Sequence, residues 1–94
     1  MNNVLWYLLC GTRGGETRAR ILFALKQKPM NANQLAQALS LDYKTVQHHV
    51  RLLLDNTVIT AVNKGKYGAL YFVGDELNAS WSDFGSIWER FGKR

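Results

Sequence analysis

The segment from Asn31 to Arg51, NANQLAQALSLDYKTVQHHVR, decides the predicted fold. It favours two short helices, because apolar residues recur at helical spacing on both sides of a turn at Ser40-Leu41. Asn31 with Gln34 three residues later predicts a capping box, and Asp42 is suited to cap the second helix. This order of elements is typical of a helix-turn-helix, whose second helix enters the major groove of DNA.

The second helix divides its residues between an apolar and a polar face. With Val46 at zero and about 100° per residue, Val50, Leu53 and His49 lie on one side. The opposite side carries Lys44, Gln47, His48 and Arg51. These side chains suit base contacts: Lys and Arg donate to guanine, Gln pairs with adenine, and His donates to a base or a phosphate. A polar face that is merely solvated is the alternative.

A β-hairpin is predicted directly after this helix. Residues 58–62 and 69–73 are rich in β-forming residues and enclose a six-residue tip at 63–68. Lys64, Lys66 and Tyr67 at the tip suit contacts with phosphates, which would add salt-dependent affinity rather than sequence choice. The alternative is a solvated hairpin whose lysines discourage strand pairing. With the preceding helices, the hairpin predicts a winged helix-turn-helix, a mainly α fold with a small β-hairpin (α+β).

Further contacts to the DNA backbone are expected upstream and at the start of the second helix. Tyr43 and Thr45 are suited to phosphate contacts that fix the register. A preceding helix is predicted from about Glu16 to Lys28, ended by Pro29. Its core face carries Ile21, Leu22 and Leu25, and its outward residues are Arg18, Lys26 and Lys28. Arg18 lies near the N-terminus of that helix, where a phosphate contact is expected.

Both ends of the chain are apolar. A short helix is predicted within residues 1–12, and an amphipathic helix from Asp75 to about Gly92, within residues 75–94. Their apolar area exceeds what a small core readily absorbs, so we expect the two ends to form a dimer interface. The expected interface residues are Leu5, Trp6, Leu9, Leu77, Trp81, Phe84, Trp88 and Phe91. Packing within one chain is the alternative; a membrane-surface role is disfavoured because the polar face is not strongly basic.

Composition limits the class of protein. Ninety-four residues with 47% hydrophobic content fit one domain spanning 1–94 with a modest core. Residues 1–74 carry a net charge of +6 and residues 75–94 a net charge of −1, so the basic excess coincides with the helix-turn-helix and hairpin. No apolar run approaches the ~20 residues of a membrane span, and no signal peptide is recognisable. We therefore expect a cytoplasmic protein without a membrane partner.

The sequence offers no candidate catalytic or metal site. The glycines of 11–15 do not match the spacing of a phosphate loop or a dinucleotide fingerprint. His48 and His49 are adjacent and point about 100° apart, so they cannot easily grip one ion. His49 is expected at the edge of the core as a hydrogen-bonded side chain, and Cys10 as a small apolar filler. No enzyme activity, cofactor or metal is expected.

Three segments resemble the ArsR-like (arsenical-repressor-like) winged-helix transcriptional regulators, particularly archaeal members. They are Asn33–Ala36, Thr45–Val50 and Lys66–Tyr71, and the resemblance covers roughly residues 13–75. It implies dimers that associate through terminal helices and bind operator DNA through the second helix and the wing. This sequence lacks the family's metal-sensing cysteine pair on that helix, so the resemblance does not extend to metal-regulated release.

The resulting hypothesis is a homodimeric transcriptional regulator that binds double-stranded DNA sequence-specifically. The main alternative is a protein-interaction winged helix, in which the aromatic C-terminal helix is the functional surface and the basic helix is solvated. A third hypothesis is a ligand-sensing regulator with a pocket at the dimer interface. It shares the DNA chemistry, and the sequence names no effector.

Overall fold

The computed structural model describes residues 5, 7–63 and 68–92, with the side chains at 10, 11, 63, 91 and 92 left out. Over this part the chain is mainly helical with one two-stranded antiparallel hairpin, as the sequence predicts. The elements are η1 (Tyr7–Gly11, a π-helix), α2 (Gly15–Gln27), α3 (Ala32–Leu39), α4 (Tyr43–Asp55), β1 (Ile59–Asn63), β2 (Ala69–Val73), α5 (Asp75–Ala79), α6 (Trp81–Ile87) and η3 (Trp88–Gly92, a π-helix).

The helix-turn-helix is formed by α3 and α4, whose starts are fixed by the predicted caps. Asn31 Oδ1 accepts from the Gln34 backbone N–H at 2.8 Å, and Gln34 Oε1 accepts from the Asn31 N–H at 2.8 Å. Asp42 Oδ2 accepts from the backbone N–H groups of Lys44 and Thr45 at 3.0 and 3.3 Å. Between the helices Ser40 adopts a left-handed conformation with φ 55°. The capping box and the position of the turn are therefore confirmed.

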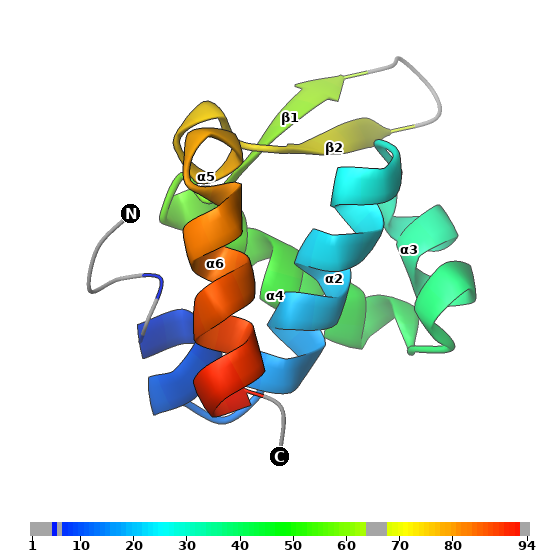
Figure 1. Cartoon of the computed structure of the whole chain (residues 1–94). Helices are drawn as coiled ribbons and strands as arrows, with labels where there is room; N and C mark the ends of the chain where they lie inside the picture. The colour runs from blue at the N-terminus through cyan, green and yellow to red at the C-terminus, as the bar shows by residue number, and fades with distance from the viewer. Residues whose placement is uncertain (1–4, 6, 64–67, 93–94) are drawn as a thin grey trace.

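The core lies where α2 crosses α4, with α3 beside them and the hairpin at one end (Figure 1). The predicted apolar face of α4 is confirmed, because Val46, Val50 and Leu53 are buried. The core face of α2 is confirmed likewise at Ile21, Leu22 and Leu25. Apolar side chains at helical spacing on both partners produce this crossing, and burial of each contributes roughly 1.5–3 kcal/mol.

The hairpin is tied to the rest of the fold through its second strand. Ile59 pairs with Val73 and Asn63 with Ala69, so β1 begins one residue later than predicted and β2 matches its predicted range. Tyr71 forms a bridge with Met30: its N–H donates to the Met30 carbonyl at 2.8 Å and its carbonyl accepts from the Met30 N–H at 3.3 Å. The wing is therefore anchored to the connection between α2 and α3.

The C-terminal region corrects a prediction. The single helix expected from Asp75 to Gly92 is divided into α5, α6 and η3, with a break at Ser80. This segment lies along α2, and η1 contacts both α2 and η3 (Figure 1). Gly15 permits the close approach of η1, since a Cβ there would lie 2.0 Å from the Leu9 carbonyl oxygen.

Four residues predicted at a dimer interface are instead buried by their own chain. They are Leu5, Leu9, Leu77 and Phe84. The prediction was wrong for these residues because α2 offers more apolar surface than expected: the Phe23 ring lies 5.1 Å from the Phe84 ring, between centroids. Trp81 and Trp88 are half-buried and make edge-to-face contacts with the Phe23 ring. Trp6 and the Phe91 side chain lie outside the described residues.

Replacing Asp42 by Ala is expected to destabilise the fold by ~1 kcal/mol, because two N–H groups at the start of α4 lose their acceptor. Urea denaturation followed by circular dichroism measures the change. Asp42→Asn, which keeps the acceptor and removes the charge, is expected to retain most of the stability. An Asn variant as unstable as the Ala variant would assign the effect to the charge at the helix terminus instead.

Candidate nucleic-acid interface

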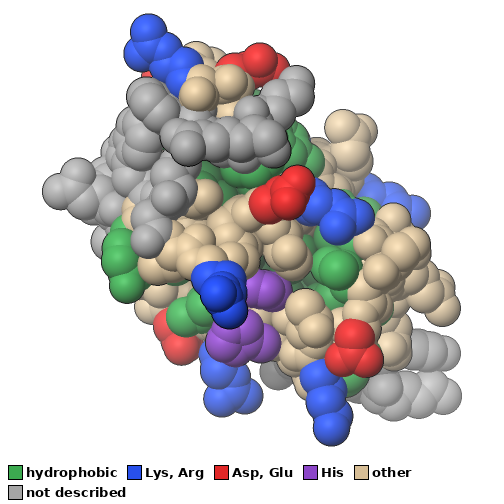
Figure 2. All heavy atoms as spheres, turned by 90° about the horizontal axis from the view of Figure 1, so that it is seen from below, with side chains coloured by type: hydrophobic (Ala, Val, Ile, Leu, Met, Phe, Trp, Pro, Cys, Tyr) green, Lys and Arg blue, Asp and Glu red, His purple; other side chains and the backbone are tan. Residues whose placement is uncertain are grey.

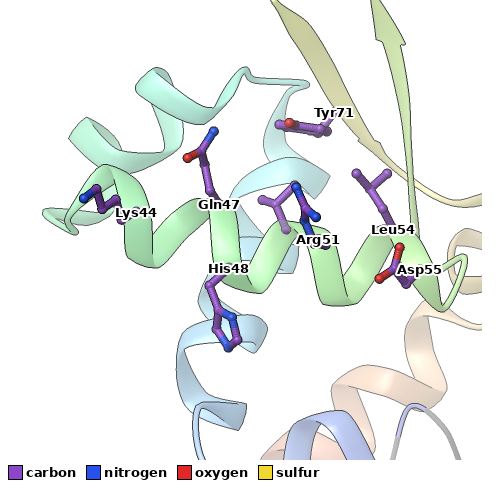
Figure 3. Close-up of a pocket in the computed structure, with 8 residues that line it drawn as sticks. Lys44, Gln47, His48, Arg51, Leu54, Asp55 and Tyr71 are labelled. Atoms are coloured by element: carbon purple, nitrogen blue, oxygen red, sulfur yellow. The ribbon is translucent and has the colours of Figure 1, made fainter.

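One face of α4 and the side of the hairpin enclose an open groove of about 730 Å³, which we call the α4 groove (Figure 3). Its lining residues are Lys44, Gln47, His48, Val50, Arg51, Leu54, Asp55 and Tyr71. The four predicted base-contacting residues are all in this set, and all four are exposed. They are presented to solvent because the opposite face of α4 is held in the core by Val46, Val50 and Leu53.

The four side chains do not all point the same way. Gln47 and Arg51 extend toward Tyr71 on the hairpin side, whereas His48 extends away from Tyr71 on the other side of α4 (Figure 3). Lys44 lies nearer the N-terminal end of the helix. The structure thus brings Gln47 and Arg51 together and leaves His48 at the opposite edge.

Tyr43 holds Gln47. The Gln47 Nε2 group donates to the Tyr43 hydroxyl at 3.0 Å, across one turn of α4. Gln47 keeps its Oε1 acceptor and a second amide hydrogen, which are the two groups needed for a bidentate contact with adenine. Tyr43, which was predicted to contact the DNA backbone, is exposed, and its hydroxyl lies beside a predicted base contact. Thr45, the other predicted backbone contact here, is exposed.

Three lining residues were missed from the sequence. Tyr71 is half-buried, and burial, with a smaller contribution from Tyr43, raises the pKa of its hydroxyl, so the hydroxyl stays protonated. Leu54 contributes apolar surface, and Asp55 adds a carboxylate one turn after Arg51. The spacing of four between Arg51 and Asp55 was a visible signal of proximity. The position of Tyr71 depends on the strand register, which the sequence did not determine.

Arg18 does not face solvent, and its predicted contact with a phosphate is therefore wrong. Its side chain is 2% exposed, and its guanidinium is bonded to Leu8, Thr12, Arg13 and His49. The reason is geometric: positions 18, 22 and 25 recur at helical spacing, which places Arg18 on the apolar face of α2. The prediction followed the residue type and overlooked the spacing. His49 is 8% exposed and hydrogen-bonded at the edge of the core, as expected.

The other residues predicted to contact the DNA backbone belong to the tip of the predicted hairpin. Lys64, Lys66 and Tyr67 lie outside the described residues. On the face seen in Figure 2, the two histidine side chains lie next to each other with Lys or Arg side chains beside them.

Within the described part of the chain, no three His, Cys, Asp or Glu side chains are grouped so that they could hold a metal ion. Nor is any described helix both long and apolar enough to span a bilayer.

Comparison with known proteins gives one family. Residues 11–68 match the family described as the N-terminal domain of the methanogenesis regulatory protein FilR1. This is a family of regulatory proteins and not of enzymes. No curated protein matches the sequence.

Solved structures of transcriptional regulators share the fold. YodB of B. subtilis in its diamide-treated form matches with a TM-score of 0.68 at 13% identity, covering 98% of this chain and 92% of that one. The reduced form of the same regulator gives 0.64 at 13% identity, covering 88% and 84%. The adhesin competence repressor AdcR of Streptococcus pyogenes gives 0.60 at 13% identity, covering 82% and 66%. At these identities the likeness establishes the winged helix-turn-helix fold.

Proposed function

The chain belongs to the family of the FilR1 N-terminal domain, and we propose that it is a homodimeric transcriptional regulator that binds double-stranded DNA sequence-specifically. Residues 1–94 act in this proposal as one winged-helix domain. The observation that carries it is the α4 groove. Its polar side chains stand on a helix that is anchored by its opposite face, and a helix presented in this way fits the major groove.

The side chains of the α4 groove have separate roles in this proposal. Gln47, oriented by Tyr43, contacts adenine, and Arg51 on the same side contacts guanine. Lys44 reaches bases or phosphates near the helix N-terminus. His48, at the opposite edge, contacts a base or phosphate further along the site. Thr45 and the hairpin residues Lys64, Lys66 and Tyr67 contribute backbone contacts, which add affinity without sequence choice.

The homodimer uses the apolar surface that the core leaves uncovered. Phe23 is 36% exposed and, with Trp88, borders an open groove of about 770 Å³, which we call the aromatic groove. Its other lining residues are Ser82, Gly85, Ser86, Glu89 and Arg90. A Cβ added to Gly85 would meet no atom within 4 Å, so a second chain can approach closely there. The two copies of α4 would then occupy half-sites about 34 Å apart.

The aromatic groove also favours one alternative function, a protein-interaction module that does not recognise DNA sequence. A titration of a fluorescent random-sequence duplex, followed by anisotropy, separates the two. A DNA-binding protein should saturate the duplex near micromolar concentration at low salt, with affinity falling steeply as salt rises. Absence of binding at about 50 mM salt would favour the interaction module.

Replacing Gln47 by Ala is expected to reduce discrimination at one base pair by about 1–3 kcal/mol, because the bidentate contact is lost. Tyr43→Phe should reduce discrimination at the same base pair by a smaller amount, because it removes only the hydroxyl that orients the Gln47 carboxamide. Binding to a panel of single-base variants of a selected site measures both.

Gln27→Ala is the matched control, because Gln27 is exposed at the end of α2 and does not line the α4 groove. Equal losses on selected and random DNA for the Gln47 and Tyr43 variants would rule out sequence-specific contacts by these residues.

Replacing Gly85 by Arg is expected to convert the dimer to a monomer, because a charged side chain would enter the aromatic groove without disturbing the core of its own chain. Sedimentation velocity measures the mass, and a circular-dichroism melt checks the fold. Gly85→Ala, which adds only a methyl group, should remain dimeric. A wild-type protein that sediments as a monomer at all concentrations, or a dimeric Arg variant, would contradict this interface.

A further inference from the structure

A buried arginine joins the N-terminal segment to α2. Arg18 Nε donates to the Leu8 carbonyl at 2.7 Å, and Nη2 donates to the Arg13 carbonyl at 3.0 Å and to the Thr12 hydroxyl. A buried cation usually has a carboxylate partner, because desolvation of an unpaired charge is costly. Among the described residues, the hydrogen-bond partners of Arg18 are uncharged.

The fourth hydrogen-bond partner of Arg18 belongs to α4. Nη1 lies 3.1 Å from Nδ1 of His49, on α4. A guanidinium has donors and no acceptor, so Nδ1 must accept this hydrogen bond. His49 is therefore neutral, with its hydrogen on Nε2. Residues 12–14 connect η1 to α2, and we call them the joint. The Arg18 side chain thus contacts η1, the joint and α4.

The backbone closes directly over this contact. Gly14 has φ 90°, and a Cβ at that position would lie 2.6 Å from Cε1 of His49 and 3.0 Å from Nη1 of Arg18. The backbone at Gly14 therefore lies against both side chains on this side. His48, a predicted base contact, packs its ring 5.1 Å from the His49 ring, between centroids.

We propose that Arg18 is a positioning residue for DNA binding, which holds α4 against the N-terminal segment through neutral His49, and that a proton on His49 releases this hold. A proton on Nδ1 would place an N–H donor against another N–H donor and two positive charges in contact. Release would allow α4, and His48 with it, to shift relative to α2. The DNA-binding part of this inference rests on the proposed function; the proton-linked contact does not.

The charges around His49 favour its neutral form. Arg18 faces it from α2 and His48 from α4 itself, while Tyr7 of η1 faces Arg18 and the Arg13 side chain is exposed. Burial, then Arg18 and His48, lower the pKa of His49 below its ordinary value. The unfolded chain therefore takes up the proton first as the pH falls. Stability is lost as the pH drops below about 6.5 and continues to fall through the folded pKa.

The first test compares thermal melts of the full chain between about pH 7.5 and about pH 5.5. His49→Asn keeps an acceptor near the position of Nδ1 but cannot titrate, so its melting temperature should depend less on pH than that of the wild type. His48→Asn removes the smallest of the three contributions to the lowered pKa of His49 and should keep most of the wild-type dependence. Identical pH dependence in the wild type and His49→Asn would overturn the proposal.

Long-range ¹⁵N NMR on the wild type gives a readout that needs no variant. His49 should show the Nε2–H tautomer at neutral pH and titrate below the ordinary histidine pKa of about 6.5. An Nδ1–H tautomer, or titration of His49 at or above a pKa of about 6.5, would overturn the proposal.

The second test asks whether the contact positions α4 for DNA. The probes are a duplex selected from a random library at about pH 7.5 and a scrambled version of the same duplex. Their affinity ratio should fall as the pH drops to about 5.5, and His49→Asn should retain the ratio. The fall should reach up to about tenfold for each unit by which binding the selected rather than the scrambled duplex lowers the pKa of His49. Because both duplexes carry the same phosphates, the ratio cancels any general change in attraction between the protein and DNA as the pH falls.

Arg18→Lys, which keeps the charge and loses the planar fork, should lower the same ratio at neutral pH while the circular-dichroism spectrum is unchanged. A ratio that stays constant with pH in the wild type would overturn the positioning role. A wild type that does not discriminate the two duplexes at about pH 7.5 would instead contradict the proposed function, and the melting and NMR results would still decide the proton-linked contact.

Discussion

The arrangement of the molecule depends on one packing contact, that of the apolar face of α4 against α2. Val46, Val50 and Leu53 of α4 and Ile21 and Leu22 of α2 are all buried, and the two helices are in contact. Each such side chain contributes roughly 1.5–3 kcal/mol by burial, so the orientation of α4 about its own axis is firmly set. The exposed face of α4 follows from that orientation. Its polar side chains are displayed because their neighbours at helical spacing are in the core.

The helix-turn-helix could be predicted from the sequence because its determinants are local. The caps at Asn31 and Asp42 and the turn at Ser40 act within three residues of themselves, and the apolar periodicity of α4 needs no knowledge of its partner. Arg18 shows where such reasoning failed. Its spacing placed it on the apolar face of α2, but no local pattern indicated that carbonyl groups of η1 and the joint would receive its guanidinium.

The packing of the chain ends and the place of Tyr71 in the α4 groove could not be predicted from the sequence, because both depend on tertiary contacts. Whether Phe84 faces a second chain or its own α2 is decided by the path after the break at Ser80, which periodicity does not reveal. Tyr71 enters the groove because β2 bridges to Met30, a pairing between residues far apart in sequence. The residues predicted from helical periodicity to contact bases all line one groove, but the direction in which His48 points could be seen only in the structure.

Selection of binding sites from a random DNA library tests the central claim most directly, that α4 of two subunits recognises a specific duplex sequence. The account predicts an enriched motif with dyad symmetry, whose half-sites are centred about 34 Å, or one helical turn, apart. An enriched motif without symmetry would contradict the homodimeric arrangement. Recovery of no motif, with all sequences bound equally or not at all, would contradict sequence-specific DNA binding itself.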